Sequence, residues 1–279
     1  MKADMHVHTV ASDGLLSPEE AVNIAVKNGL QMLAVTDHDT TFNTEKVNTL
    51  CQNAGIIGVK GIEVSAYYDN VKVHTLGYGF DLNNAQFKVF LAELYEGSLK
   101  RTEQIISKLN ACGINLTFED AAAERTSDNT PVHVMHIARA AVKKRLAQNP
   151  FSFYKKYLMP GAPAASNICR PTPERAIDVI NAAGGFAVMA HPGRIELQKT
   201  ELYDLIARLV RAGLGGIEAV YSSHTTQETA YYKEIAKEFG LLVTGGSDTH
   251  FTGGNRAIGS PVFHPSEDLW QRLKFDKIF

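Results

Sequence analysis

Histidines and carboxylates stand at the ends of short apolar runs along this chain, and no other feature restricts its possible folds as strongly. His6 and His8 close a first segment in which apolar and polar residues alternate, which is the period of a β-strand. Side chains two residues apart on a strand point the same way and lie about 6.5 to 7 Å apart. Both imidazoles can therefore converge on one ion while Val7 faces the core. The segment predicts a strand that ends in a metal site.

The chain then alternates between predicted strands and helices. Ser17 and Pro18 begin a helix as its N-cap and first residue, and Gly29 ends it. Further strands are predicted over residues 32–35, 56–64, 71–78, 186–190, 216–220 and 241–244. This alternation implies a parallel sheet, and barrels of this kind carry their chemistry on the loops that follow the carboxyl ends of the strands. Nearly every candidate ligand follows such a strand.

The rhythm changes between residues 83 and 167. Apolar residues such as Phe87, Phe90 and Leu94 recur there at helical spacing, and prolines interrupt the far side of the segment. The length of 279 residues suits one barrel-sized domain that carries an insertion. We therefore predict a barrel formed by residues 1–82 and 168–279, and a mainly helical insertion, 83–167, that covers the site.

Composition narrows the class of protein. The net charge of -2 provides no global field for nucleic acid or an anionic membrane, so any attraction for phosphate must be local. Cys51, Cys112 and Cys169 are widely spaced, which argues against disulfides and against a thiolate metal site. No apolar run approaches membrane-spanning length, and the first candidate ligand at position 6 leaves no room for a secretion signal. We expect a soluble, cytoplasmic protein with no membrane partner.

Nine residues of the types that bind divalent cations are candidate metal ligands. They are His6, His8, Asp13, His38, Glu63, His74, His191, Asp248 and His250. Glu63 lies in an otherwise apolar strand, where an unpaired carboxylate is costly and a position between two cations would remove that cost. Asp13 could instead belong to an ordinary turn, and His74 could be a satisfied core histidine.

Other residues are candidates for substrate contact. Arg194 lies close to His191 and is the first choice for holding a phosphate oxygen. His224 follows a predicted strand and could contact the substrate or donate a proton to the leaving group. His133 and His136 fall in the insertion, where a surface position and a functional one are both open.

Together, these motifs resemble those of the PHP (polymerase and histidinol phosphatase) superfamily. The matching motifs are Asp4-x-His6-x-His8, Ser12-Asp13-Gly14, Thr36-Asp37-His38-Asp39, Gly61-x-Glu63, His74, Ala190-His191-Pro192 and Gly246-Ser247-Asp248-x-His250. Ser12-Asp13-Gly14 and the runs that end at Tyr221 and Asp248 indicate a bacterial branch of stand-alone phosphoesterases. That branch includes 3',5'-nucleoside bisphosphate phosphatases and a 5'-to-3' exoribonuclease acting on short RNA.

The resemblance implies a distorted (β/α)7 barrel and two or three divalent ions. It assigns His6, His8, Glu63 and Asp248 to one ion, Glu63, His74 and His191 to a second, and Asp13, His38 and His250 to a third. It favours Mn²⁺, while Fe²⁺ and Zn²⁺ suit the same mixed imidazole and carboxylate ligands. The implied reaction is hydrolysis of nucleotide phosphate esters by a hydroxide that bridges two of the ions.

One position departs from the family pattern. Related members have an arginine two residues before the histidine of a His-x-Ala-Arg stretch, where this chain has Val134 before His136. Arg139 or Arg170 could replace the lost phosphate contact, or the substrate could differ. A bisphosphate, a nucleoside monophosphate and short RNA ends therefore stay open as substrates.

Three alternatives remain beside this reading. An amidohydrolase-type barrel that cleaves carbon–nitrogen bonds is disfavoured by the extra ligands and by the lack of a clear bridging lysine. A histidinol phosphate phosphatase is disfavoured by Asp13, where some other groups of the superfamily have histidine. A non-catalytic metal-binding accessory domain is disfavoured by the intact ligand set. The oligomeric state and the identity of the general acid do not follow from the sequence.

Overall fold

A computed structural model describes residues 1–252 and 256–273, and its centre is one seven-stranded sheet. The strands neighbour one another in chain order: β1 (Ala3–Val7), β2 (Met32–Val35), β3 (Ile57–Tyr68), β4 (Val71–Tyr78), β5 (Phe186–Met189), β6 (Gly216–Tyr221) and β7 (Leu242–Gly246). A bridge between Val7 and Thr249 brings the chain after β7 beside β1 and nearly closes the sheet. The predicted distorted barrel is confirmed.

The sheet departs from the expected parallel arrangement at β4. This strand runs antiparallel to both β3 and β5, whereas the other neighbouring strands are parallel. Only Asp69 and Asn70 separate β3 from β4. A two-residue link makes a hairpin, because a parallel return needs a crossover of a dozen or more residues. The prediction of a parallel sheet was therefore wrong at this strand.

Strand β1 also departs from simple alternation. Its pairing with β2 shifts register between Asp4 and Val7. Ala3 and Met5 pack in one apolar cluster, while Val7 packs in another, on the side of α1. A bulge of this kind re-aims the side chains that follow it. The regular alternation expected for this segment is therefore interrupted between Asp4 and Val7.

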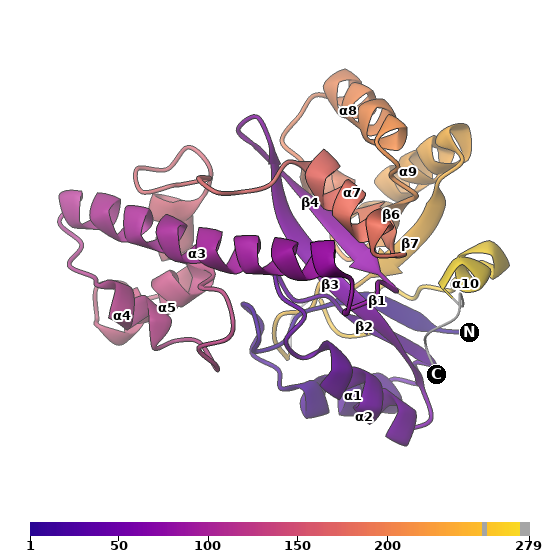
Figure 1. Ribbon diagram of the computed structural model, residues 1–279, viewed down its shortest axis with the longest axis horizontal. Coiled ribbons are helices and arrows are strands. Elements are labelled where there is room, and N and C mark those ends of the chain that lie inside the picture. The colour runs from indigo at the N-terminus through magenta and orange to yellow at the C-terminus, as the bar shows by residue number, and fades with distance from the viewer. Residues whose placement is uncertain (253–255, 274–279) are drawn as a thin grey trace.

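Helices surround the barrel as the sequence pattern predicts. They are α1 (Pro18–Lys27), α2 (Thr44–Asn53), α7 (Pro173–Ala182), α8 (Lys199–Arg211), α9 (Thr226–Phe239) and α10 (Glu267–Leu273), and Figure 1 shows α1 and α2 on one side of the sheet with α7, α8 and α9 on the other. Ser17 caps α1 in a capping box with Glu20. No described helix combines the length and the apolar character that crossing a membrane requires.

The inserted segment contains α3 (Ala85–Ala111), α4 (Phe118–Ala122), α5 (Val134–Lys143), α6 (Pro150–Phe153) and a π-helical turn (Tyr154–Leu158). In Figure 1, α3 extends from the barrel to α4 and α5. Phe87 and Phe90 of α3 pack in a core with Ile180 of α7. Farther along the same helix, Ile105 packs in a second core with Ile137 of α5. Helix α3 thus contributes to two hydrophobic cores. The boundaries of the insertion at residues 83 and 167 stay a prediction.

Close contact between β1 and β7 places the ends of the chain's first and last strands together. A Cβ atom on Gly246 would lie 2.3 Å from the His6 Cβ and 2.6 Å from its backbone nitrogen. Glycine therefore permits an approach that no other residue allows. The Asp248 N–H donates to the His6 carbonyl at 2.7 Å. This contact sets the first and the last metal-binding motifs beside each other.

Candidate metal centre

The structure brings all nine predicted ligands together inside the barrel opening. His6 and His8 come from β1 and the residue after it, Glu63 and His74 come from the β3–β4 hairpin, and the others come from loops after strands. Every one of these side chains is buried except His250, whose side chain is 22% exposed. Motifs that are separate in the sequence thus contribute their side chains to one continuous cluster.

One group of four side chains has the geometry of a single ion site. His6, His8, Glu63 and Asp248 each offer an atom to a common point. The Nε2 atoms of His6 and His8 lie 3.2 and 3.1 Å from Glu63 Oε2, and His8 Nε2 lies 3.2 Å from Asp248 Oδ1. Ligand atoms about 2.0 to 2.2 Å from one tetrahedral ion lie roughly 3.3 to 3.6 Å from each other. The four atoms are therefore close to the spacing that one cation imposes.

The hydrogen bonds leave lone pairs facing one another in this group. His6 Nδ1 lies 2.9 Å from Glu218 Oε1, which places the His6 proton on Nδ1 and a lone pair on Nε2. That lone pair lies 3.1 Å from His8 Nε2. Glu63 Oε2 and His74 Nε2 are buried with no hydrogen-bond partner among the described residues. Unsatisfied buried groups cost about 1 to 3 kcal/mol each, and divalent cations would remove that cost.

Glu63 lies between two groups of potential ligands. Its Oε2 belongs to the first group, and its Oε1 lies 2.6 Å from His74 Nδ1 and 3.0 Å from His191 Nε2. His38, Glu63 and His74 also offer atoms to one point. A carboxylate with an oxygen in each of two groups is the arrangement expected of a bridging ligand. The second ion predicted at Glu63, His74 and His191 stays a prediction, because His38 competes with His191 for that place.

A further group surrounds Asp13. His8, Asp13, His38 and His250 offer atoms within reach of one ion. Asp13 Oδ2 lies 3.2 Å from His250 Nε2, and the His8 and His250 rings stack at 4.3 Å between centroids. The predicted third set of Asp13, His38 and His250 is therefore assembled. His8 and His38 each belong to two of the groups, so the division of ligands among the ions stays a prediction.

The electrostatics of the cluster favour positive charge. Burial alone would raise the pKa of Asp248, yet the imidazoles of His250 and His6 hold that pKa well below its usual range. Burial alone would lower the pKa of His8, yet Asp248 and Glu63 raise it to about 10. Protons on His6 and His8 thus balance the carboxylates when no other cation is present, whereas burial holds the pKa values of His38 and His74 well below their usual range. The residues fit a group of divalent ions.

Glu218 is a functional residue that the sequence analysis missed. It lies in β6 and is fully buried, with Oε1 at the His6 imidazole and Oε2 accepting the His191 backbone N–H at 2.8 Å. Carboxylates that orient metal-binding histidines in this way fix the ring tautomer and raise ligand basicity. A lone carboxylate in an apolar strand, the signal that identified Glu63, could also have found it.

Two arginines approach the centre from its rim. Arg194 donates to Asp248 Oδ2 and to the Tyr221 hydroxyl, both at 3.1 Å, and its side chain is 48% exposed. Arg256 donates to the same Asp248 oxygen at 2.9 Å. The position predicted for Arg194 beside the ligands is thus observed, while its contact with phosphate stays a prediction. Arg256 has no motif around it that could have singled it out.

His224 has no free ring atom for proton transfer. Its Nδ1 lies 3.0 Å from the Ala219 carbonyl oxygen and therefore carries a proton that it donates there. Its Nε2 accepts the Gly193 N–H at 3.1 Å. The side chain supports the loop that carries Arg194, and this geometry favours a structural role over the predicted proton donation.

The insertion reaches the centre through α5. His133 stacks on His38 with the ring planes 3° apart, and its Nδ1 lies 3.3 Å from Asp13 Oδ2. Arg139 donates to the Asp13 carbonyl oxygen. His136 is 1% exposed and accepts the His133 N–H at 3.0 Å, which favours a structural role over substrate contact. The sequence left both a surface position and a functional position open for His133. Its burial against the predicted ligands favours the functional position.

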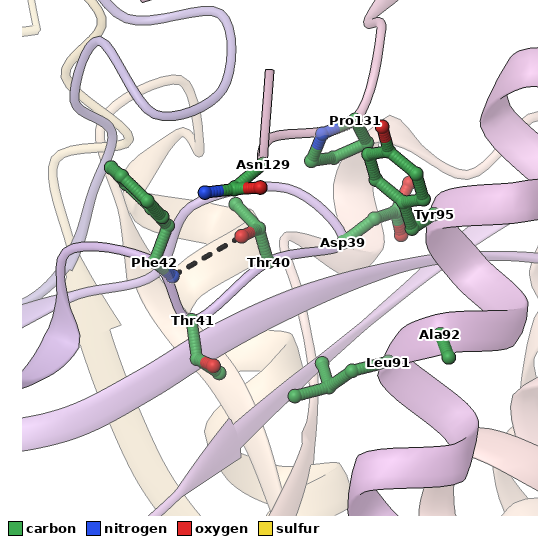
Figure 2. A pocket seen from close by; sticks show the side chains of 9 residues that line it. All are labelled: Asp39, Thr40, Thr41, Phe42, Leu91, Ala92, Tyr95, Asn129 and Pro131. Carbon is green, nitrogen blue, oxygen red and sulfur yellow. Dashed lines mark hydrogen bonds between the residues drawn. The ribbon is translucent and has the colours of Figure 1, made fainter. Parts of the chain in front are cut away.

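A cavity of about 280 Å³ opens beside the centre, between α3 and the loop after β2. Figure 2 shows Phe42 on one side, Tyr95 on the other and Asn129 between them. Asp39, the neighbour of His38, also lines the cavity and forms an ion pair with Arg170. Arg170 was predicted to contact the substrate, and the ion pair engages its guanidinium within the protein.

Comparisons with known proteins agree with this geometry. The family model described as "PHP domain" matches residues 4–157. A 3',5'-nucleoside bisphosphate phosphatase from Chromobacterium violaceum is 33% identical over 97% of this chain and 96% of its own length. The 5'-3' exoribonuclease Rnm from Escherichia coli is 31% identical over 96% of this chain and 92% of its own length.

Solved structures share the fold over the whole chain. A protein from Chromobacterium violaceum named as an amidohydrolase, with bound sulfate, superposes with a TM-score of 0.87, 30% identity and coverage of 98% of this chain and 96% of its own. A protein from Bifidobacterium adolescentis assigned as a metal-dependent phosphoesterase has a TM-score of 0.86, 27% identity and coverage of 97% and 94%.

Proposed function

The chain belongs to the PHP domain family, and on that premise we propose that it hydrolyses phosphate esters of nucleotides at a centre of two or three divalent ions. Relatives named as phosphatase and exoribonuclease make it a metal-dependent phosphoric ester hydrolase. The nucleotide substrate, the number of ions and the ligand roles are the proposed part. Among the ions that suit mixed imidazole and carboxylate ligands, we favour Mn²⁺ over Fe²⁺ or Zn²⁺.

The observation that carries the proposal is the position of Glu63. Its two oxygens belong to two adjacent groups of imidazole and carboxylate atoms, and Oε2 is buried without a hydrogen-bond partner among the described residues. Two ions held by these groups would supply a nucleophilic water at neutral pH and would neutralise charge on the phosphoryl group.

The protein's own residues bind and orient the ester. Arg194 is half exposed at the rim, and its guanidinium can turn from Asp248 toward a phosphate group, to two oxygens of which it can donate parallel hydrogen bonds. Arg256 donates to the same Asp248 oxygen and keeps this carboxylate paired when Arg194 turns away. His224 keeps the Arg194 loop in place through Gly193. The insertion, proposed as residues 83–167, closes the site on the side of Asp13 through α5.

A small phosphorylated substrate agrees with both named relatives. One acts on a nucleoside that carries two phosphates, and the other on RNA, in which each nucleotide carries one. We propose nucleotides or short RNA ends over histidinol phosphate for this reason. Carbon–nitrogen hydrolysis, the activity suggested by the word amidohydrolase, stays the second candidate because one structural neighbour bears that name.

Metal analysis followed by a phosphate-release screen tests the proposal. Purified protein loaded with Mn²⁺ is offered 3',5'-bisphosphates, 5'-monophosphates, short RNA, histidinol phosphate and simple amides. We expect release from the nucleotides or RNA. Turnover of amides alone, or of histidinol phosphate alone, would overturn the proposal.

Replacement of Asp248 provides the matched test of the centre. We expect Asp248→Ala to abolish turnover and to lower the metal content, because the first group loses one of its four atoms. Asp204→Ala, at an exposed position on α8, is the control and should retain both properties. An active Asp248→Ala enzyme with full metal content would contradict the assignment.

A further inference from the structure

Lys72 lies on the face of the β3–β4 hairpin that carries the metal-binding residues. It is two residues from His74 on β4, so both side chains point to the same face of the sheet, about 6.5 to 7 Å apart along the strand. The strand register pairs His74 with Ser65 and Lys72 with Tyr67. Ser65 and Tyr67 in turn share a face with Glu63. Lys72 is therefore the next inward-facing residue beyond His74, toward the tip of the hairpin.

The Lys72 ammonium has no partner of its own. No described residue forms an ion pair within 4.0 Å or a hydrogen bond with its Nζ, and the side chain is half-buried. The carboxylates whose charges act on it are Glu63 and Asp13, both predicted metal ligands. Bound ions would neutralise these two carboxylates. A half-buried lysine would then face the opening of the site without a counter-ion.

Other cations near Lys72 add to the positive charge that lacks a counter-ion. The charges of Arg194 and Arg170 act on the Lys72 ammonium. Arg101 on α3 is 3% exposed and lies close enough to Arg170 to be affected by its charge. Asp39 forms an ion pair with Arg170 and Asp248 forms one with Arg194, whereas no described carboxylate forms an ion pair with Lys72 or Arg101. Lys72 and Arg101 therefore remain as cations without a paired carboxylate.

There is also room for a ligand next to this region. A cavity of about 420 Å³ lies between the hairpin and the chain after α6, and Tyr67, the cross-strand partner of Lys72, lines it together with Asn70 and Asn167. The Tyr67 N–H donates to the Pro171 carbonyl at 2.9 Å, which holds Arg170 beside the hairpin. The positive charge is thus located at the joint between the barrel and the insertion.

We propose that Lys72, with Arg170 behind it, forms a second phosphate subsite beside the metal centre and selects substrates that carry a phosphate in addition to the one being cleaved. The inference rests on the proposed phosphoesterase function and specifies its substrate class. One phosphate occupies the ions and Arg194, and the other accepts hydrogen bonds from the Lys72 ammonium about one strand step away. Lys72 is a specificity-determining residue that takes the place of the arginine missing at Val134.

Kinetics with paired substrates test this subsite. Adenosine 3',5'-bisphosphate is compared with adenosine 5'-monophosphate, and a 5'-phosphorylated dinucleotide with the same dinucleotide bearing a 5'-hydroxyl. We expect Lys72→Met to raise KM about 10- to 100-fold for the substrate with the extra phosphate in one pair, and to alter kcat by less than about 3-fold. The pair that responds shows whether the second phosphate belongs to a bisphosphate or to RNA. Lys72→Arg should restore most of the discrimination.

Lys60→Met is the matched control, because Lys60 is also half-buried but points to the opposite face of β3 from Glu63. It should leave discrimination unchanged, and all variants should keep the wild-type metal content. The inference would be overturned if Lys72→Met weakened both members of a pair equally, left both pairs unchanged, or lost metal.

Binding of a non-hydrolysable probe separates this inference from the proposed function. Butane-1,4-bisphosphonate and butylphosphonate are titrated calorimetrically into the Mn²⁺-loaded protein. We expect the wild type to bind the bisphosphonate about 10-fold more tightly, and Lys72→Met to lose this preference. A protein that showed the preference but cleaved no phosphate ester would refute the proposed function and retain the subsite. Equal binding of both probes by an active wild-type enzyme would refute the subsite alone.

Discussion

At the scale of the residue, a single carboxylate holds two of the predicted ligands. Glu218 contacts the His6 imidazole with one oxygen and the His191 backbone N–H with the other. His191 has a positive φ of 25°, a conformation that costs a non-glycine residue about 1 to 3 kcal/mol and persists only when its surroundings hold it. Glu218 therefore controls both the proton position on His6 and the placement of His191.

We expect Glu218→Gln to lower metal affinity about 10- to 100-fold, because the variant keeps the side-chain volume but removes the charge that polarises His6. Competition with a chromogenic chelator measures this change. Glu234→Gln, at an exposed position on α9, is the control and should bind metal like the wild type. An unchanged affinity in Glu218→Gln would show that the contact to His6 does not tune the centre.

At the scale of the element, α5 secures the loop between β1 and α1. Arg139 donates to the Asp13 carbonyl oxygen, and His136 is hydrogen-bonded to the Ser12 backbone. Before the helix begins, Thr126 donates to the Val10 carbonyl at 2.7 Å. The insertion therefore fixes the loop that carries Asp13, whereas the first group of ligands depends on barrel strands and the loop after β7.

We expect Arg139→Met to remove about one equivalent of metal per chain and to leave the ions at Glu63 in place, because the change loosens only the Asp13 loop. Inductively coupled plasma mass spectrometry measures the content. Lys143→Met lies on the exposed side of the same helix, with the lysine side chain 72% exposed, and should retain full occupancy. Loss of every ion, or of none, would contradict the inference that the insertion positions only the Asp13 group of ligands.

At the scale of the whole molecule, the centre ties together segments that are far apart in the chain. The Asp248 N–H donates to the His6 carbonyl, and Glu63 of the β3–β4 hairpin contacts the His6 imidazole. The buried carboxylates and imidazoles that meet there carry charges that the apolar barrel interior does not solvate. Ions bound at this junction should therefore stabilise the entire fold and not one loop.

Removal of metal should lower the melting temperature substantially. Ions present at about 1,000 times their dissociation constant stabilise a protein by about 4 kcal/mol, which corresponds to roughly 8 to 16 °C for a chain of this size. Differential scanning fluorimetry before and after chelation, and again after Mn²⁺ is restored, measures the shift. Asp248→Ala should show a much smaller shift than the wild type. An equally large shift in that variant, or none in the wild type, would disprove the link between centre and fold.

Local properties of the chain were sufficient to predict much of this architecture. The alternating segment before His8, the glycine stops and the single carboxylate in the apolar strand at Glu63 report on neighbours a few residues away, where strand and helix periodicity act. They predicted the strands, the helical insertion and the set of side chains that meet in the barrel. The strands predicted over 56–64 and 71–78 left only residues 65–70 between them, which is too short for a parallel crossover, although the expected parallel sheet overlooked this.

Only the tertiary structure decided which distant groups touch. The pairing of Glu218 with His6, the stacking of His133 on His38 and the unpartnered position of Lys72 join segments that no sequence period relates. A polar side chain can be paired within the protein, orient a metal ligand or remain available to bind a substrate. Its role depends on the charges that packing brings within a few ångströms of it. The amino-acid sequence determined which residues could bind the metal ions, and the packing of barrel against insertion determined what surrounds them.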